Sequence, residues 1–207
     1  MGLWDCLSRP IYRLIDCEGD MSRNAAVTEE KILDLAEKMI RDNGYNGFSF
    51  REIASGIGVK SSSVHYYFPA KSDLGVKVAN RYSERFMDAL GDPADAPKTA
   101  EAVLNKVHGL FVSALQKDGQ MCLCGVLAAE TPGLPVDVAM EAKAFFDRVT
   151  KWLVVSLSRT DWGKGRPEDD LQAQALSTLA LLEGGMMVAR VQGRPDLLAS
   201  MKPQLAD

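Results

Sequence analysis

The sequence predicts an all-α protein, with a three-helix head near its N-terminal end and a larger helical domain behind it. Apolar residues recur at spacings of three and four along most of the chain, and no stretch alternates in the manner of a half-buried strand. Two short helical patterns near residue 55 are joined by a glycine-bearing turn. A proline-bearing break, Gly91 to Lys98, separates them from four later helical patterns.

The composition is that of an ordinary globular protein. The chain has 207 residues, of which 46% are hydrophobic and 25% charged. A net charge of −4 does not exclude nucleic-acid binding, because such binding needs a local basic surface and not a basic protein. No apolar run approaches the roughly 18 residues of a membrane-spanning helix. Four cysteines without a signal-peptide pattern lead us to expect a soluble, cytoplasmic protein with reduced thiols.

Residues 1–20 do not fit the pattern of the rest. They contain Cys6 and Cys17, have no helix-cap signal, and are too mixed in charge for a signal peptide. We expect an accessory or disordered arm, with Met21 as an alternative start of the protein.

The first helix of the head is predicted over residues 28–43, with Thr28 as its N-cap and Gly44 at its end. Its apolar stripe comprises Ile32, Leu35, Ala36, Met39 and Ile40.

The next stretch, residues 48–74, predicts a helix-turn-helix. Ser49 and Glu52 have the spacing of a capping box, in which the glutamate returns to the N–H of the cap residue. Gly56 and Gly58 stand where the first helix must end and the chain must turn. A second N-cap is expected among Ser61, Ser62 and Ser63, with Val64 and Phe68 packing inward. Pro69 ends this helix, and the next is predicted over residues 71–90.

A helix pair of this kind presents the start of its second helix to base edges in the DNA major groove. Hydroxyl groups and cations at its ends can donate to phosphates, and tyrosine rings can contact thymine methyl groups. The alternative is an ordinary helical hairpin with a solvated polar surface. The expected DNA-binding residues are Thr28, Ser49, Arg51, Lys60, Ser61, Ser62, Ser63, His65, Tyr66, Tyr67 and Lys71.

From about Thr28 to Val78 the chain resembles the DNA-binding domain of the tetracycline-repressor (TetR) family. The resemblance rests on the runs SFREIASGIGV and SVHYYFPAKSDL. The order of the aromatic run differs, since family members usually place a tyrosine first and this chain places His65 there. The resemblance implies a transcriptional regulator, usually a repressor, that binds a palindromic operator as a homodimer and is released by a small-molecule inducer. It also implies that Thr28 makes a phosphate contact.

The break after residue 90 predicts two domains beyond the arm. Residues 21–90 form the helix-turn-helix domain, with its linking helix, and residues 91–207 form a helical ligand-binding and dimerisation domain. Helices are predicted over residues 99–117, 122–130, 137–159 and 169–192. The last two have apolar residues on more than one face and so need a partner beyond their own bundle. The resemblance implies that they pair with their copies in a second subunit, with close approach at Ala180, Gly184 and Gly185.

Methionine and aromatic residues of the larger domain suit an adaptable pocket for an apolar ligand, although each is equally a candidate for the core. The expected lining is Phe111, Met121, Cys122, Cys124, Leu127, Phe145, Trp152 and Met186. Cys122 and Cys124 leave three interpretations open: buried apolar residues, a redox or electrophile sensor or thiol enzyme with a lowered thiol pKa, and part of a metal site. Because no catalytic base or cofactor motif accompanies them, we expect no enzyme, metal or cofactor.

Overall fold

The computed structural model describes the backbone of residues 14–206 and the side chains of residues 26–117 and 119–206. Every regular element in this part of the chain is helical, which confirms the predicted all-α class. The α-helices are α1 (Leu14–Asn43), α2 (Phe50–Ile57), α3 (Ser61–Tyr67), α4 (Lys71–Leu90), α5 (Ala100–Asp118), α6 (Leu123–Ala129), α7 (Val136–Ser158), α8 (Glu168–Val191) and α9 (Leu197–Ser200). Short 3-10 turns are η3 (Tyr45–Gly47), η4 (Pro93–Asp95) and η5 (Thr131–Gly133).

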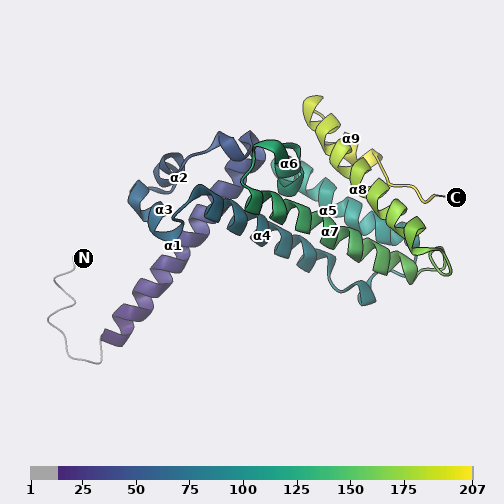
Figure 1. The fold of residues 1–207 in the computed structure, drawn as a ribbon, viewed down its shortest axis with the longest axis horizontal. Coiled ribbons are helices and arrows are strands. Elements are labelled where there is room, and N and C mark those ends of the chain that lie inside the picture. The colour runs from purple at the N-terminus through teal and green to yellow at the C-terminus, as the bar shows by residue number, and fades with distance from the viewer. Residues whose placement is uncertain (1–13, 207) are drawn as a thin grey trace.

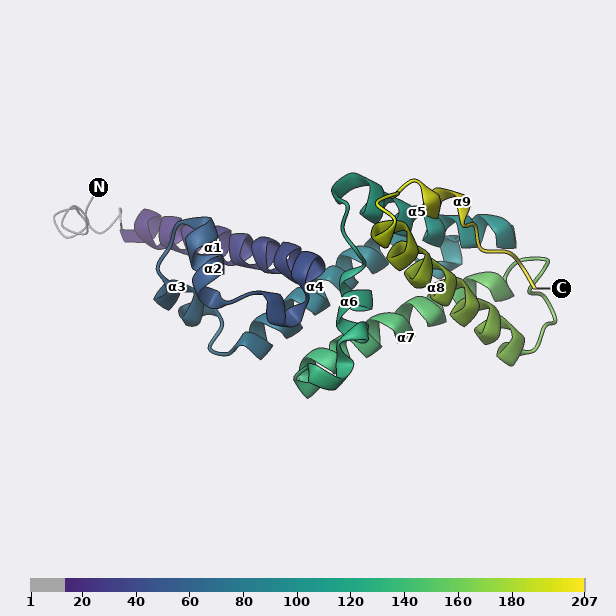
Figure 2. The ribbon, with the colours of Figure 1, turned by 90° about the horizontal axis from the view of Figure 1, so that it is seen from above.

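The molecule has a head and a body. In both views α1, α2 and α3 lie together at one end, while α5, α7 and α8 form a bundle at the other (Figures 1 and 2). Helix α4 runs from the head into the body, where it packs on α7. The small helix α6 lies where the two parts meet, in contact with α1, α4 and α7. This position makes α6 part of the contact between them.

Helix α1 begins earlier than the sequence predicted. It starts at Leu14 and passes through Thr28, so Thr28 is an interior residue of the helix and not its N-cap. No glycine or proline lies between Asp20 and Asn43, so nothing in this segment opposes helical backbone. Of the expected arm, residues 1–13 lie outside the described residues, and residues 14–20 form the first turns of α1.

An aromatic cluster joins α4 to the body. The Phe86 ring of α4 packs edge-on against Phe111 of α5 and Phe145 of α7, with centroid distances of 5.6 and 5.1 Å. Tyr82, one turn earlier, packs 5.8 Å from Phe145. Full burial of a large apolar side chain contributes about 1.5–3 kcal/mol, so the buried Tyr82 and the partly buried Phe86 together hold α4 to the bundle. The core is continuous from α1 to α9.

Helix α9 was not predicted, and it changes the environment of α8. A Cβ atom at Gly185 would lie 2.8 Å from Leu198 of α9 and 3.1 Å from Met201, so Gly185 allows this segment to pack closely. The expectation that Gly185 faces a second subunit is therefore wrong, because the chain itself occupies that side. A Cβ at Gly184 would meet no atom within 4 Å, and Ala180 is exposed. No helix among the described residues is long and apolar enough to cross a membrane.

Candidate nucleic-acid interface

The first helix of the predicted pair forms as expected, with one difference at its cap. The Ser49 hydroxyl accepts a hydrogen bond from the Glu52 backbone N–H at 3.3 Å and donates one to the Glu52 carboxylate at 2.8 Å. The carboxylate thus binds the hydroxyl of the cap residue, where we expected it to bind the backbone N–H. At the other end Gly58 has a φ of +73°, and Val59 donates to the Ala54 carbonyl at 2.9 Å. This is the left-handed helix ending that glycine favours.

Gly56 has a different role from Gly58. A Cβ atom at Gly56 would lie 2.4 Å from a methyl carbon of Leu35 on α1. The missing side chain therefore lets α2 pack closely on α1. Because α2 leads through the turn into α3, this contact contributes to the position of α3 within the head.

Helix α3 starts at Ser61, and the predicted serine N-cap is wrong. The N-cap residue is Lys60, which makes no side-chain capping bond; its carbonyl accepts from the Ser63 N–H at 2.9 Å. The three serines instead occupy the first turn, and no capping bond uses their hydroxyls. The first turn of a helix also carries N–H groups without intrahelical partners, which favour an anion. The start of α3 therefore offers donors to a phosphate.

The two faces of α3 differ sharply. Val64 and Phe68 are buried in the head, as predicted, whereas Tyr66 is 81% exposed. The His65 ring packs edge-on against Phe50 at 4.7 Å, and the half-buried Tyr67 ring lies 5.3 Å from Tyr66. Helix α3 is thus anchored by two apolar side chains while a tyrosine points to solvent.

The remaining predicted contacts are divided between exposed and engaged side chains. Arg51 and Lys60 are exposed, and Thr28 is half-buried on α1. Lys71 is also half-buried: its ammonium donates to the Phe48 carbonyl at 2.7 Å and lies 4.2 Å from the centre of the Phe48 ring. Burial lowers the pKa of Lys71, while the Glu52 and Glu130 carboxylates oppose that shift. This lysine therefore joins the start of α4 to the segment before α2.

Polar contacts that the sequence did not predict tie the head to the body. The Arg41 guanidinium of α1 donates to the Met121 carbonyl, just before α6, at 2.7 Å. At the other end of α6 the Glu130 carboxylate accepts from the Tyr45 N–H at 2.8 Å. Arg190 of α8 donates to the Arg41 and Asp42 carbonyls at 3.0 and 3.1 Å. In the sequence, the only sign of these contacts is that Arg41 and Arg190 each stand next to buried residues of their helices. Their partners could not be predicted, because they are about 80 or more residues away.

Comparison with known proteins places this geometry in a family. The family model described as bacterial regulatory proteins, tetR family, matches residues 32–76, which include α2 and α3. The crystal structure of a TetR transcriptional regulator from Legionella pneumophila has a TM-score of 0.76 and 32% sequence identity to this chain. The match covers 83% of this chain and 91% of that one. The chain belongs to the TetR family.

Curated relatives of this TetR-family regulator agree on its class. An HTH-type transcriptional regulator of Xanthobacter autotrophicus is 30% identical over 106 residues, covering 47% of this chain and 52% of the relative. The HTH-type transcriptional repressor KstR2 of Mycolicibacterium smegmatis is 26% identical over 97 residues, covering 47% of this chain and 46% of that protein. The chain thus spans about half the length of these relatives. Its helix-turn-helix is the DNA-binding domain of a transcriptional regulator.

The residues expected to line a ligand pocket lie in the packed core of this TetR-family body. Phe111, Met121, Cys122, Cys124, Leu127, Phe145, Trp152 and Met186 are each at most 5% exposed. Whether a ligand reaches any of them stays a prediction.

Of the three interpretations of Cys122 and Cys124, the structure favours buried apolar residues, because both side chains are at most 1% exposed. Burial, followed by the charge of Glu183, raises the pKa of both Cys122 and Cys124, whereas a sensor or catalytic cysteine needs a lowered pKa. In the described part of the chain no group of three or more His, Cys, Asp or Glu residues could hold a metal ion.

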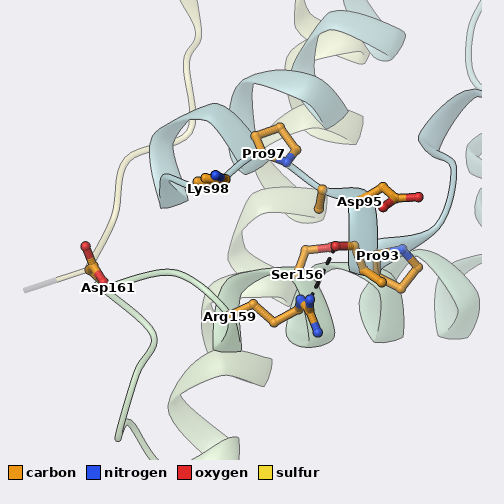
Figure 3. A pocket seen from close by; sticks show the side chains of 9 residues that line it. Pro93, Asp95, Pro97, Lys98, Ser156, Arg159 and Asp161 are labelled. Atoms are coloured by element: carbon orange, nitrogen blue, oxygen red, sulfur yellow. Dashed lines mark hydrogen bonds between the residues drawn. The ribbon is translucent and has the colours of Figure 1, made fainter.

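A large polar cavity lies at the far end of the body. It has a volume of about 710 Å³ and lies between η4 and the end of α7, with Lys98, Ser156 and Arg159 among its lining residues (Figure 3). The Arg159 guanidinium donates to the Ala94 carbonyl at 3.3 Å, and the buried Ser156 hydroxyl has no hydrogen-bond partner among the described residues. This cavity does not match the apolar pocket that the composition predicted.

An apolar cavity of about 360 Å³ lies between α6, α7 and α8. Its lining includes Phe146, Leu176, Ala180 and Met187, together with one ionisable residue, Glu183. Sequence reasoning missed Glu183. The available signal was an acidic residue inside the apolar run LALLEGGMM, directly after a leucine of the buried stripe.

Proposed function

We propose that this TetR-family regulator is a ligand-responsive repressor, which binds a palindromic operator as a homodimer and is released by a small-molecule inducer. The observation that carries the proposal is the exposed face of α3. Its first turn offers N–H groups and serine hydroxyls, and Tyr66 is 81% exposed on a helix held by two buried residues. A rigid helix with exposed donors and an aromatic ring suits the major groove.

Phosphate contacts are assigned to the residues around this helix. Lys60 is exposed directly before α3, where its charge extends the positive end of the helix dipole, and Arg51 is exposed in the first turn of α2. Ser49 holds its own cap and Lys71 binds the Phe48 carbonyl, so each orders the backbone while it contacts DNA. Lysine has three donor hydrogens, so Lys71 retains donors for a phosphate.

The proposed dimer uses α7 and α8. Large apolar side chains are exposed along one stripe of α8, at Leu176, Met187, Val188 and Val191, and Val191 is 89% exposed. Ala180 and Gly184 lie on the same stripe and leave room for a second backbone. A stripe of this size on a water-soluble helix indicates a protein interface. A two-fold dimer would place two heads one helical turn of DNA apart, about 34–36 Å.

Release by a ligand requires a connection between body and head, and the contacts of α6 supply one. Helix α6 is held to the head at both ends: Met121, before its start, accepts from Arg41 of α1, and Glu130, after its end, accepts from Tyr45 of η3. A ligand that binds better when α6 is displaced would favour head positions that do not fit the operator; equal affinity for both states would change nothing. Repression, rather than activation, is supported by the relative KstR2, which is a transcriptional repressor, and by the family resemblance.

The test begins with selection of fragments of the encoding genome that the purified protein binds, followed by titration of the best fragment at several salt concentrations. We expect a palindrome bound with a Kd of about 10 nM or tighter, and log affinity that falls linearly with log salt. Lys60→Ala should reduce the slope by about 1, whereas Lys164→Ala, an exposed lysine between α7 and α8, should not change it.

Tyr66 separates the proposal from an inert helical hairpin. Tyr66→Ala should weaken operator binding by about 1–3 kcal/mol and change the free energy of unfolding by less than about 0.5 kcal/mol, because the side chain is exposed. Tyr66→Phe keeps the ring and loses only the hydroxyl, so it reports how far the phosphate contact contributes. Wild-type affinity in Tyr66→Ala, or the absence of any enriched fragment, would refute the proposed DNA surface.

A further inference from the structure

The polar cavity at the far end of the body is built from two segments that meet only in the fold. One wall is residues 93–98, which contain η4 and lead into α5, and the other is the end of α7 with Ser156 and Arg159 (Figure 3). Its volume of about 710 Å³ lies within the usual range of ligand pockets. Its lining residues come from α7, the loop after it and residues 93–98, and so lie apart from the α8 stripe proposed for the second subunit.

The α7 wall of the cavity also lies away from the exposed apolar side chains of that helix. Val136 and Met140 are exposed near the start of α7, whereas Ser156 is buried near its end. With 3.6 residues per turn, Ser156 lies roughly 160° around the helix from both of them. A second copy packed on the exposed apolar face of α7 would therefore not fill this cavity.

The cavity wall contains a hydroxyl group without a partner. Ser156 is 1% exposed, and its Oγ has no hydrogen bond with any described residue. A buried hydroxyl usually has at least one partner, and a serine within a helix can donate to the carbonyl four residues before it. Ser156 makes no such bond, so an acceptor in the cavity would satisfy its donor.

Two cations stand beside this hydroxyl, one on each wall. Arg159 follows Ser156 by one turn, and Lys98 lies at the end of the opposite segment. Within the described residues neither belongs to an ion pair, and Arg159 donates only to the Ala94 carbonyl, at 3.3 Å. A guanidinium group has five N–H donors, so most donors of Arg159 stay available to a molecule in the cavity.

We propose that this cavity binds a small organic molecule with one carboxylate, which accepts two parallel N–H bonds from Arg159 and one O–H bond from Ser156. A planar carboxylate matches the guanidinium fork, and charge-assisted bonds of this kind are stronger than neutral ones. Lys98 adds attraction from the other wall. The inference rests on the proposed function as a ligand-responsive regulator and names the chemical class of the ligand.

Two acidic residues of the lining limit the negative charge that the cavity accepts. Asp95 and Asp161 balance the charges of Lys98 and Arg159, and in the view of Figure 3 they lie on either side of Arg159. A carboxylate leaves the occupied site with a single net negative charge. A phosphate or phosphonate dianion adds a second charge and more repulsion from both aspartates, so a carboxylate is preferred.

The position of the cavity connects it to α4, which also joins the body to the head. Helix α4 ends at Leu90, and Trp152, one turn before Ser156, donates to the Gly91 carbonyl at 2.8 Å. A carboxylate held between residues 93–98 and α7 would add a second connection at this end of α4. A ligand that binds one position of α4 better than another would change the positions of the heads.

The test compares 3-phenylpropanoate with 3-phenylpropanamide and 2-phenylethylphosphonate. All three carry a phenyl group, chosen because Pro93 and Pro97 give the cavity a partly apolar wall. Calorimetric titration of the full chain near pH 8 should give a Kd at least about tenfold lower for the carboxylate than for the amide. The phosphonate, a dianion at this pH, should bind more weakly than the carboxylate.

Variants of the lining separate the two contacts. Arg159→Gln should remove the preference for the carboxylate over the amide, and Arg159→Lys should restore only part of it, because an ammonium group lacks the planar fork. Ser156→Ala should weaken carboxylate binding about fivefold without lowering the midpoint temperature of thermal unfolding, because it removes an unsatisfied group. Lys151→Gln makes the same change of charge at an exposed position of α7 and should behave as the wild type.

Equal affinity for the carboxylate and the amide, no binding of either, tighter binding of the phosphonate, or an unchanged preference in Arg159→Gln would overturn the inference. DNA binding is measured separately on the selected fragment, with and without 3-phenylpropanoate. If the carboxylate binds through Arg159 and leaves the affinity for DNA unchanged, the ligand site stands and its role in induction is refuted. If no fragment is selected, the proposed function fails, while the calorimetric comparison still decides the site.

Discussion

Replacing Glu183 with glutamine should stabilise the protein at alkaline pH and have little effect at acidic pH. Burial raises the pKa of Glu183 from 4.5 to about 7. Between these values the folded protein holds a proton that the unfolded chain has lost, so the free energy of unfolding falls as pH rises through this window. Below about pH 4.5 the carboxyl group is neutral in both the folded and the unfolded protein, so it causes no loss of unfolding free energy there. Glutamine is neutral at every pH and should remove the dependence.

The expected size follows from the two pKa values. A change from 4.5 to about 7 corresponds to about 3 kcal/mol of unfolding free energy, lost in full above pH 7. For a protein of 207 residues, this difference raises the midpoint temperature of thermal unfolding of the variant by about 6–12 °C near pH 8. Both the amide and the protonated acid bury a neutral polar group, so the cost of that burial cancels when the two pH values are compared.

The measurement is urea unfolding of wild type, Glu183→Gln and Glu168→Gln at pH 4.5 and pH 8, at one fixed protein concentration. A fixed concentration matters because a dimer gains stability by mass action. The quantity compared is the difference in unfolding free energy between each variant and wild type. Glu168 is exposed, so its variant should show no pH-dependent gain. If Glu183→Gln gains no more stability at pH 8 than at pH 4.5, the carboxylate is not buried as described.

Four further substitutions or labelling experiments test the head, its contact with the body, the thiols and the subunit interface. Val64→Ala should cost roughly 2 kcal/mol of stability, because the side chain is fully buried under α3, and chemical denaturation measures it. Gly44→Ala should cost about 1–3 kcal/mol and weaken operator binding, because Gly44 has a φ of +81° and an added Cβ would meet the Glu130 carboxylate. Alkylation near pH 7.5 with peptide mapping should leave Cys122 and Cys124 unmodified until urea is added; labelling of the native protein would contradict their burial. Val188→Glu should shift sedimentation toward the monomer, whereas the exposed Gln172→Glu near the start of α8 should not.

Local patterns determined much of the fold. Apolar spacing and helix-ending glycines predicted α4, α5, α7 and α8 to within a residue or two, because these signals depend on neighbours three or four positions away. The helix-turn-helix was predicted for the same reason, through Ser49, Gly58 and the aromatic run. The misplaced caps at Thr28 and at the serines of α3 show the limit of such signals: a residue suited to a cap does not become one when the helix continues through it or begins just before it.

The tertiary structure alone decided which side chains are available. Gly185 was expected at a subunit contact, but the unpredicted α9 covers it. Lys71 carries a charge suited to DNA, and the fold also binds it to the Phe48 carbonyl. In the sequence, Glu183 is a single charged residue in an apolar helix. In the fold, α6 packs over it at Gly125 and buries its carboxylate. Burial and pairing depend on segments distant in the chain, so the sequence by itself determined the helices and the motif, while packing determined the charges, the cavity and the contacts that join head to body.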